Sequence, residues 1–74
     1  MRSRFDEQLA LLNKEMIEMG ALCEEVIALS AQSLTEGSTE LAARVAPLDE
    51  EIDRKEREIE AICLRLLLQP VSYT

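Results

Sequence analysis

The chain divides at Glu36-Gly37-Ser38-Thr39-Glu40, which separates two long segments whose apolar residues recur with helical spacing. Gly37 suits the left-handed conformation that ends a helix, and Ser38 or Thr39 suits the N-cap of the next one. Glu40 would then lie in a first turn, where a negative charge complements the positive end of the helix dipole. The stretch predicts a tight turn between two helices.

Apolar residues on both sides of this turn recur in steps of three and four, which is the period of a helix face and not of a strand. Before the turn they are Phe5, Leu9, Leu12, Met16, Met19, Leu22 or Cys23, Val26 and Leu29, and after it Leu41, Val45, Leu48, Ile52, Ile59, Ile62 and Leu66. We predict an all-α fold with one domain over residues 1–74. Its two helices, over residues 3–36 and 39–69, form an antiparallel hairpin.

The register of this hairpin follows from the position of the turn. If the chain reverses near Gly37, the numbers of facing residues add up to about 75. The predicted pairs are Leu9 with Leu66, Leu12 with Ile62, Met16 with Ile59, Leu22 with Ile52, and Val26 with Leu48, and all of them are apolar. The same register keeps Cys23 and Cys63 roughly 16 Å apart along the helices, which excludes an intrachain disulfide.

Two residues of the second helix break its pattern. Pro47 removes a backbone hydrogen bond and its ring clashes with the preceding turn. The helix is therefore either continuous and kinked near residues 43–47, or a short helix ends near Ala46 and Pro47 opens the main one. We expect the kink, because the apolar stripe keeps its phase. Lys55 interrupts the stripe, and we expect its stem in the groove and its ammonium in water.

Both helices carry more apolar surface than a single contact between them can cover. Beside its main stripe, the first helix carries a second set of apolar residues. The end of the second helix is apolar nearly all round, from Ile62 to Leu68. The second set consists of Leu11, Ile17, Ala21, Ile27, Ala28, Ala31 and Leu34. Soluble monomers rarely expose so large a patch. We therefore expect coiled-coil-like self-association, most simply a homodimer of hairpins that forms a four-helix bundle.

Composition excludes several classes of function. The 74 residues carry 8 basic and 15 acidic side chains, a formal net charge of -7, and no histidine. So acidic a chain lacks the positive charge that binds nucleic acid or an anionic membrane. It also lacks the commonest general base and metal ligand. No apolar run is long enough to span a bilayer, so we expect a cytoplasmic protein in which Cys23 and Cys63 are buried thiols.

The polar segment over residues 49–60 has two interpretations. The first is a solvated helix face with ion pairs four residues apart: Glu50 with Arg54, Glu51 with Lys55, and Asp53 with Arg57. The alternative is a hard-cation site, because Asp49, Asp53, Glu56 and Glu60 share one face. We favour the solvated face. The sequence offers no catalytic triad and no phosphate-binding glycine loop, and we assign no catalytic, cofactor-binding or metal-binding residue.

The ordered pattern of residues resembles the first two helices of PhoU-like regulators of phosphate uptake, over residues 3–71. The most specific pieces are Asp49-x-x-Ile52-Asp53 and Gln69-Pro70-Val71. The remaining matching residues are Phe5, Leu9, Met19-Gly20, Val26, Ala31, Leu41-Ala42, Val45, Glu56, Ile59-Glu60, Cys63 and Leu66-Leu67.

This resemblance implies a cytoplasmic, all-helical accessory protein without enzyme activity. Such proteins act as negative regulators of phosphate signalling, together with a phosphate ABC transporter and a sensor kinase. The family is built from two three-helix repeats and binds metal clusters through a Glu-Arg-x-x-Asp motif on each third helix. Here Ser72-Tyr73-Thr74 follows Val71 where that helix would begin. We therefore expect a truncated or split member, and we carry no metal ligand over to this chain.

Two other functions fit part of the pattern. One is a generic coiled-coil adaptor whose partner helix comes from another protein. The other is a small all-helical enzyme similar to chorismate mutase, which shares an Ile-Asp pair followed by leucine-rich heptads. That enzyme chemistry binds a dianion and needs converging cations. The available basic residues, Arg4, Lys14, Arg57 and Arg65, are scattered along the chain.

Overall fold

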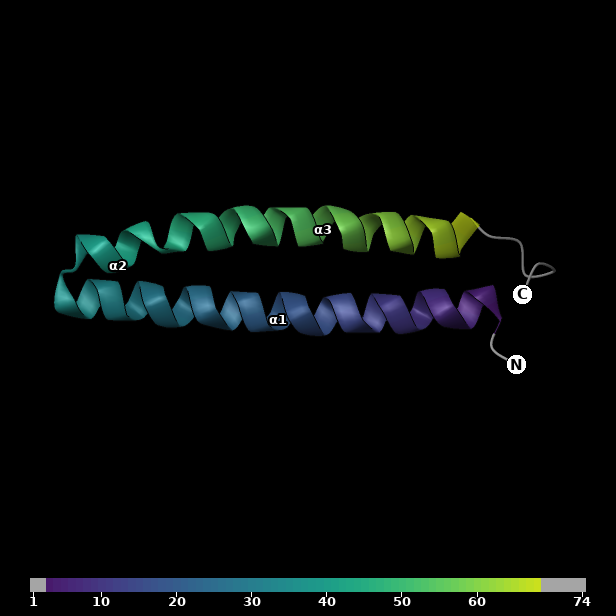
Figure 1. Cartoon of the computed structure of the whole chain (residues 1–74), viewed down its shortest axis with the longest axis horizontal. Coiled ribbons are helices and arrows are strands. Elements are labelled where there is room, and N and C mark those ends of the chain that lie inside the picture. Colours follow the sequence, from purple (N-terminus) through teal and green to yellow (C-terminus); the bar gives the residue numbers. More distant parts are fainter. Residues whose placement is uncertain (1–2, 69–74) are drawn as a thin grey trace.

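The structure, a computed structural model, describes residues 3–68, and all its regular elements are helices. They are α1 (Arg4–Glu36), α2 (Thr39–Ala43) and α3 (Val45–Leu68). After the turn the chain runs back along α1, so that the beginning of α1 and the end of α3 lie at the same end of the rod (Figure 1). The predicted all-helical class is confirmed. The predicted helix end at residue 69 and the Gln69-Pro70-Val71 motif lie outside the described residues.

The first helix begins one residue later than predicted, because Ser3 is its N-cap. The Asp6 N–H donates to the Ser3 hydroxyl at 3.1 Å, and the Ser3 N–H donates to the Asp6 carboxylate at 3.4 Å. This reciprocal capping box satisfies two backbone donors that the helix itself leaves free. The carboxylates of Asp6 and Glu7 also complement the helix dipole.

The turn has the chemistry that the sequence predicts. Gly37 is left-handed, with φ 63° and ψ 31°, and the Ser38 N–H donates to the Ser33 carbonyl at 3.1 Å. The Ser33 hydroxyl donates to the Ser38 carbonyl at 2.9 Å, and the Leu41 N–H donates to the Ser38 hydroxyl at 3.1 Å. Ser38 is thus both the second residue beyond α1 and the N-cap of α2, which makes the reversal short.

We expect Gly37→Ala to lower the free energy of unfolding by about 1–2 kcal/mol, because a Cβ disfavours the left-handed conformation. Gly20→Ala is the matched control. Gly20 lies inside α1 with nothing within 4 Å of an added Cβ, so this change should raise stability by up to about 1 kcal/mol. Urea titrations followed by circular dichroism measure both values. Equal effects of the two substitutions would contradict the assigned role of Gly37.

The second predicted helix is interrupted, so the expected continuous kinked helix is wrong. Helix α2 ends at Ala43, three residues before the end at Ala46 that the alternative predicts, and α3 begins at Val45, two residues before Pro47. The Arg44 N–H donates to the Leu41 carbonyl at 3.1 Å. This bond spans three residues, as in a 3₁₀ turn, whereas an α-helical bond spans four. Pro47 therefore falls in the first turn of α3, where its missing N–H would have no partner in the helix. The break removes the clash between the Pro47 ring and the preceding turn.

The core is a narrow seam along the line where α1 meets α2 and α3. Among the described residues, the only buried apolar side chains are Leu29 and Ile62. Glu15 is buried as well, and the remaining residues of this seam are half-buried. On α1 the seam consists of Phe5, Gln8, Leu12, Glu15, Met19, Leu22, Val26, Leu29 and Ser33, and on the returning arm of Leu41, Val45, Leu48, Ile52, Lys55, Ile59, Ile62 and Leu66. We call these residues the seam.

The predicted seam is wrong at Leu9 and Met16, whose side chains are 43% and 56% exposed. Their places are taken by Gln8 and Glu15, one residue earlier, so the predicted pairs with Leu66 and Ile59 are not core pairs. Apolar contacts have little directional preference, whereas a lysine in the seam must find acceptors. The polar partners of Lys55 therefore help to set which face of α1 turns inward.

Candidate functional site

The centre of the hairpin holds a three-residue ionic cluster. The Lys55 ammonium contacts a carboxylate oxygen of Glu15 at 2.5 Å and one of Glu18. Glu15 is 8% exposed, and the Lys55 side chain is 18% exposed. The expectation that the Lys55 ammonium points into water and pairs with Glu51 is therefore wrong. Lys55 reaches across the seam to two carboxylates that lie one turn apart on α1.

This cluster shifts the acidity of its members in opposite directions. The hydrogen bond from Lys55 lowers the pKa of Glu15 below 4.5. The hydrogen bonds to Glu15 and then Glu18 raise the pKa of Lys55 above 10.5. Both shifts favour the charged forms, as expected for an ion pair. At neutral pH the cluster is a stable polar contact, and neither shift brings a group towards the neutral pKa of a general acid or base.

Sequence reasoning missed the roles of Gln8 and Glu15 in the seam. The available signal was the charge of Lys55, because a cation at a seam position needs acceptors on the opposite helix. Glu15 and Glu18 are three residues apart and lie on neighbouring turns of one face. A search for such an acidic pair would have located the partners.

The candidate cation-binding row lies on the exposed surface of α3. The side chains of Asp49, Asp53, Glu56 and Glu60 are all exposed. Within residues 3–68, no three histidine, cysteine, aspartate or glutamate side chains come close enough together to hold a metal ion. The row follows one edge of α3 as the sequence predicts, and α1 brings no further carboxylate to it.

The two cysteines are free thiols, as predicted, but they are half-buried and not buried. Cys23 directly follows the seam residue Leu22 on α1, and Cys63 directly follows Ile62 on α3. The basic residues Arg4, Lys14, Arg57 and Arg65 are all exposed. This arrangement provides no desolvated cationic pocket of the kind that recognises a dianion.

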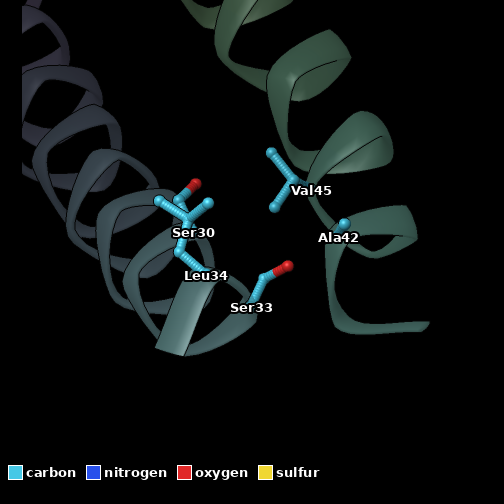
Figure 2. A pocket seen from close by; sticks show the side chains of 5 residues that line it. All are labelled: Ser30, Ser33, Leu34, Ala42 and Val45. Carbon is cyan, nitrogen blue, oxygen red and sulfur yellow. The ribbon is translucent and has the colours of Figure 1, made fainter. Parts of the chain in front are cut away.

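A shallow notch lies beside the turn, with a volume of about 300 Å³. Figure 2 shows side chains from α1 on one side and from α2 and α3 on the other. The lining residues are Ser30, Ser33, Leu34, Ala42 and Val45, none of which is charged. The Ser33 hydroxyl already donates to the Ser38 carbonyl. The notch is therefore suited to an apolar side chain and offers no catalytic group.

A large part of the apolar surface remains uncovered in the single chain. Ile17 and Ile27 on α1 are 67% and 68% exposed, and Leu64 and Leu67 on α3 are 50% and 79% exposed. Leu34 is exposed to 85%. The expectation that the two helices cannot cover these residues is confirmed. Apolar surface that is exposed to this extent is typical of interaction sites.

Comparison with known proteins assigns this hairpin to a family. The PhoU domain model matches residues 16–73. The chain is 39% identical over 66 residues to a phosphate-specific transport system accessory protein PhoU homolog of Synechocystis, covering 89% of this chain and 30% of that protein. The homolog of the same name in Rhizobium meliloti is 39% identical over 72 residues, covering 95% of this chain and 30% of its own length.

A third homolog, from Zymomonas mobilis, is 36% identical over 63 residues, 85% of this chain and 27% of that protein. The chain thus spans less than a third of the length of these relatives. No solved structure gives a significant match. None of the helices in the described part of the chain has the length and hydropathy needed to cross a bilayer. The match over most of its residues places this chain in the PhoU family.

Proposed function

We propose that this chain is an accessory negative regulator of phosphate transport and phosphate-responsive signalling. It acts in the cytoplasm through helix-to-helix contacts with other proteins and has no enzyme activity. Membership of the PhoU family supports the connection with phosphate, because its relatives are named as accessory proteins of a phosphate-specific transport system. The proposed partners are a phosphate ABC transporter and a sensor kinase.

The proposed mechanism is supported by the uncovered apolar surface. A cationic pocket or a buried catalytic group would favour an enzyme, whereas the described residues present an exposed apolar face along a rigid rod. Faces of this type bind helices of a partner. We further propose that the antiparallel hairpin associates with its own copies through this face and forms a four-helix bundle.

Regulation is tested by expressing the chain in a bacterium that lacks its own PhoU protein and carries a phosphate-responsive reporter gene. In phosphate-rich medium we expect the chain to lower reporter expression. The matched control is Ile27→Glu, which places a charge on the exposed face and leaves the seam unchanged. Unaltered reporter expression with a folded, abundant chain would refute the proposed regulation.

Self-association is tested separately by analytical ultracentrifugation. We expect a dimer or larger assembly at micromolar concentration, because the exposed leucine and isoleucine side chains gain by leaving water. A folded, soluble monomer under these conditions would refute self-association. The regulatory proposal would then still be tested by the reporter measurement, which does not depend on self-association.

A further inference from the structure

The two sides of the hairpin differ in charge. In an antiparallel pair of helices, residues that directly precede the seam lie on one side, and residues that directly follow it lie on the other. On the preceding side, the charged residues of α3 alternate in sign: Glu51, Arg54, Glu58 and Arg65. On the following side, all the charged residues of α3 are carboxylates. We call them the acidic row, and they are Asp49, Asp53, Glu56 and Glu60.

The acidic row has no cation of its own. All four side chains are exposed, and no basic side chain within residues 3–68 makes an ion pair with any of them. The pair of Asp53 with Arg57 that the sequence suggests is therefore not formed. Like charges three or four residues apart on a helix repel each other and weaken the helix slightly. A cationic partner would turn this cost into a favourable contact.

The part of α1 on the same side of the hairpin is apolar. Each of its residues directly follows a seam residue, so they repeat the alternation of four and three that is typical of helix pairing. None of them is charged, although 31% of the chain is. The exposed apolar members are Leu9, Met16, Ile27 and Leu34. We call the whole set the outer row, and it consists of Leu9, Asn13, Met16, Gly20, Cys23, Ile27, Ser30 and Leu34.

We propose that the outer row and the acidic row together form a docking surface for a basic amphipathic helix of another protein. The apolar stripe of that helix covers the outer row, and lysine or arginine side chains along one of its flanks meet the acidic row. This inference rests on the binding of partner helices proposed above. It adds the side of the hairpin that binds and the charge of the partner.

The two rows lie at the same level of the rod. Lys55 lies within the span of the acidic row and contacts Glu15 and Glu18, so the acidic row is level with Met16 of the outer row. Nothing lies within 4 Å of a Cβ added at Gly20, so a helix can approach α1 closely here. The acidic row extends over roughly 16 Å, or three helical turns. A helix with cations at the same spacing meets all four carboxylates, whereas a single metal ion reaches only part of the row.

The notch beside the turn opens on the same side of the hairpin. Three of its lining residues, Ser30, Leu34 and Ala42, directly follow seam residues. Figure 2 shows the side chains of α1 on one wall and those of Ala42 and Val45 on the other. An apolar side chain near the end of the partner helix can therefore enter this uncharged space of about 300 Å³.

A second copy of this chain is a poorer occupant of this side. The twofold symmetry that pairs two outer rows also sets the two acidic rows against each other, and their carboxylates repel. Ile17 and Leu64 lie two positions past seam residues, which places them outside this side, and both are exposed. Self-association can use these residues while the outer row and the acidic row stay open.

The test measures binding of a synthetic helical peptide by isothermal titration calorimetry at low ionic strength. The peptide carries a leucine stripe and, along one flank, lysines at the spacing of the acidic row. We expect the chain to bind it, and the double variant Asp53→Asn with Glu56→Gln to bind it about fivefold or more weakly. The matched control is Glu51→Gln with Glu58→Gln, which removes as many charges from the other side of α3 and should change binding by less than about twofold. Circular dichroism shows that each variant is folded.

A second peptide, with glutamine in place of each lysine, separates charge from apolar contact. We expect it to bind more weakly than the lysine peptide and with less dependence on salt. Equal binding of the two peptides, or equal losses in the two double variants, overturns the inference. A chain that sediments as a dimer and binds neither peptide assigns the surface to a second copy and also overturns it. A chain that lowers reporter expression but binds no lysine peptide refutes this inference alone and leaves the proposed regulation intact.

Discussion

Ile62→Ala is expected to lower the free energy of unfolding by about 2–5 kcal/mol, the largest effect of any single truncation in this chain. Ile62 is 3% exposed, and it shares the buried apolar core of residues 3–68 with Leu29 alone. So small a core leaves little to compensate for the lost contacts and the cavity. We expect the variant to be largely unfolded at room temperature.

The control for this prediction is Leu64→Ala, two residues further along α3. Leu64 is 50% exposed on the side of the helix away from the seam, so its truncation should cost less than about 1 kcal/mol. Urea titrations followed by circular dichroism give both values at one protein concentration, which matters because association adds to stability. Similar losses at the two positions would mean that the seam is not the core.

Lys55→Glu is expected to reverse the pH dependence of stability. In the natural chain, the lowered pKa of Glu15 gives stability that is present above pH 4.5 and lost as the pH falls through that lowered pKa. The raised pKa of Lys55 gives stability that is present below pH 10.5 and lost as the pH rises through it. The contribution of the cluster is therefore constant over the range between these two limits.

The variant brings a third carboxylate to Glu15 and Glu18, with no cation between them. Repulsion then destabilises the hairpin at neutral pH, and protonation relieves it in acid. Thermal unfolding at pH 7 and pH 4 should show the natural chain more stable at pH 7 and the variant more stable at pH 4. Lys55→Met is the control, because it removes the charge and adds no repulsion. The same pH profile for all three chains would contradict a role for the cluster.

Several features could be predicted from single residues, since their causes are local. Gly37 and Ser38 specify the turn because only a few residue types adopt a left-handed cap or supply an N-cap oxygen. The surplus apolar surface was also predictable, because two helices have only one contact face each. The break before Pro47 was harder, since the loss of a backbone bond fits both a kink and a break.

The choice of inward face on α1 could not be predicted by counting apolar residues. Leu9 and Met16 form as good a helical stripe as the seam does, because the two rows differ by a single residue step. The decisive contact is that of Lys55 with Glu15 and Glu18, which lie on the other helix 37 to 40 residues away. Such a pairing depends on how the two helices face each other, and the apolar pattern is compatible with either of the two rows on α1.

Local patterns in the amino-acid sequence were enough to predict the helices, the place where the chain reverses, and the presence of apolar surface that one chain cannot cover. These properties depend on periodicity, cap chemistry and composition, which act over a few neighbouring residues. The packing of the two helices against each other had to be known to see that Glu15 and Gln8 face inward and that Leu9 and Met16 stay exposed. A charge in the seam needs oppositely charged partners on the facing helix, and Lys55 has them only when Glu15 and Glu18 face it across the seam.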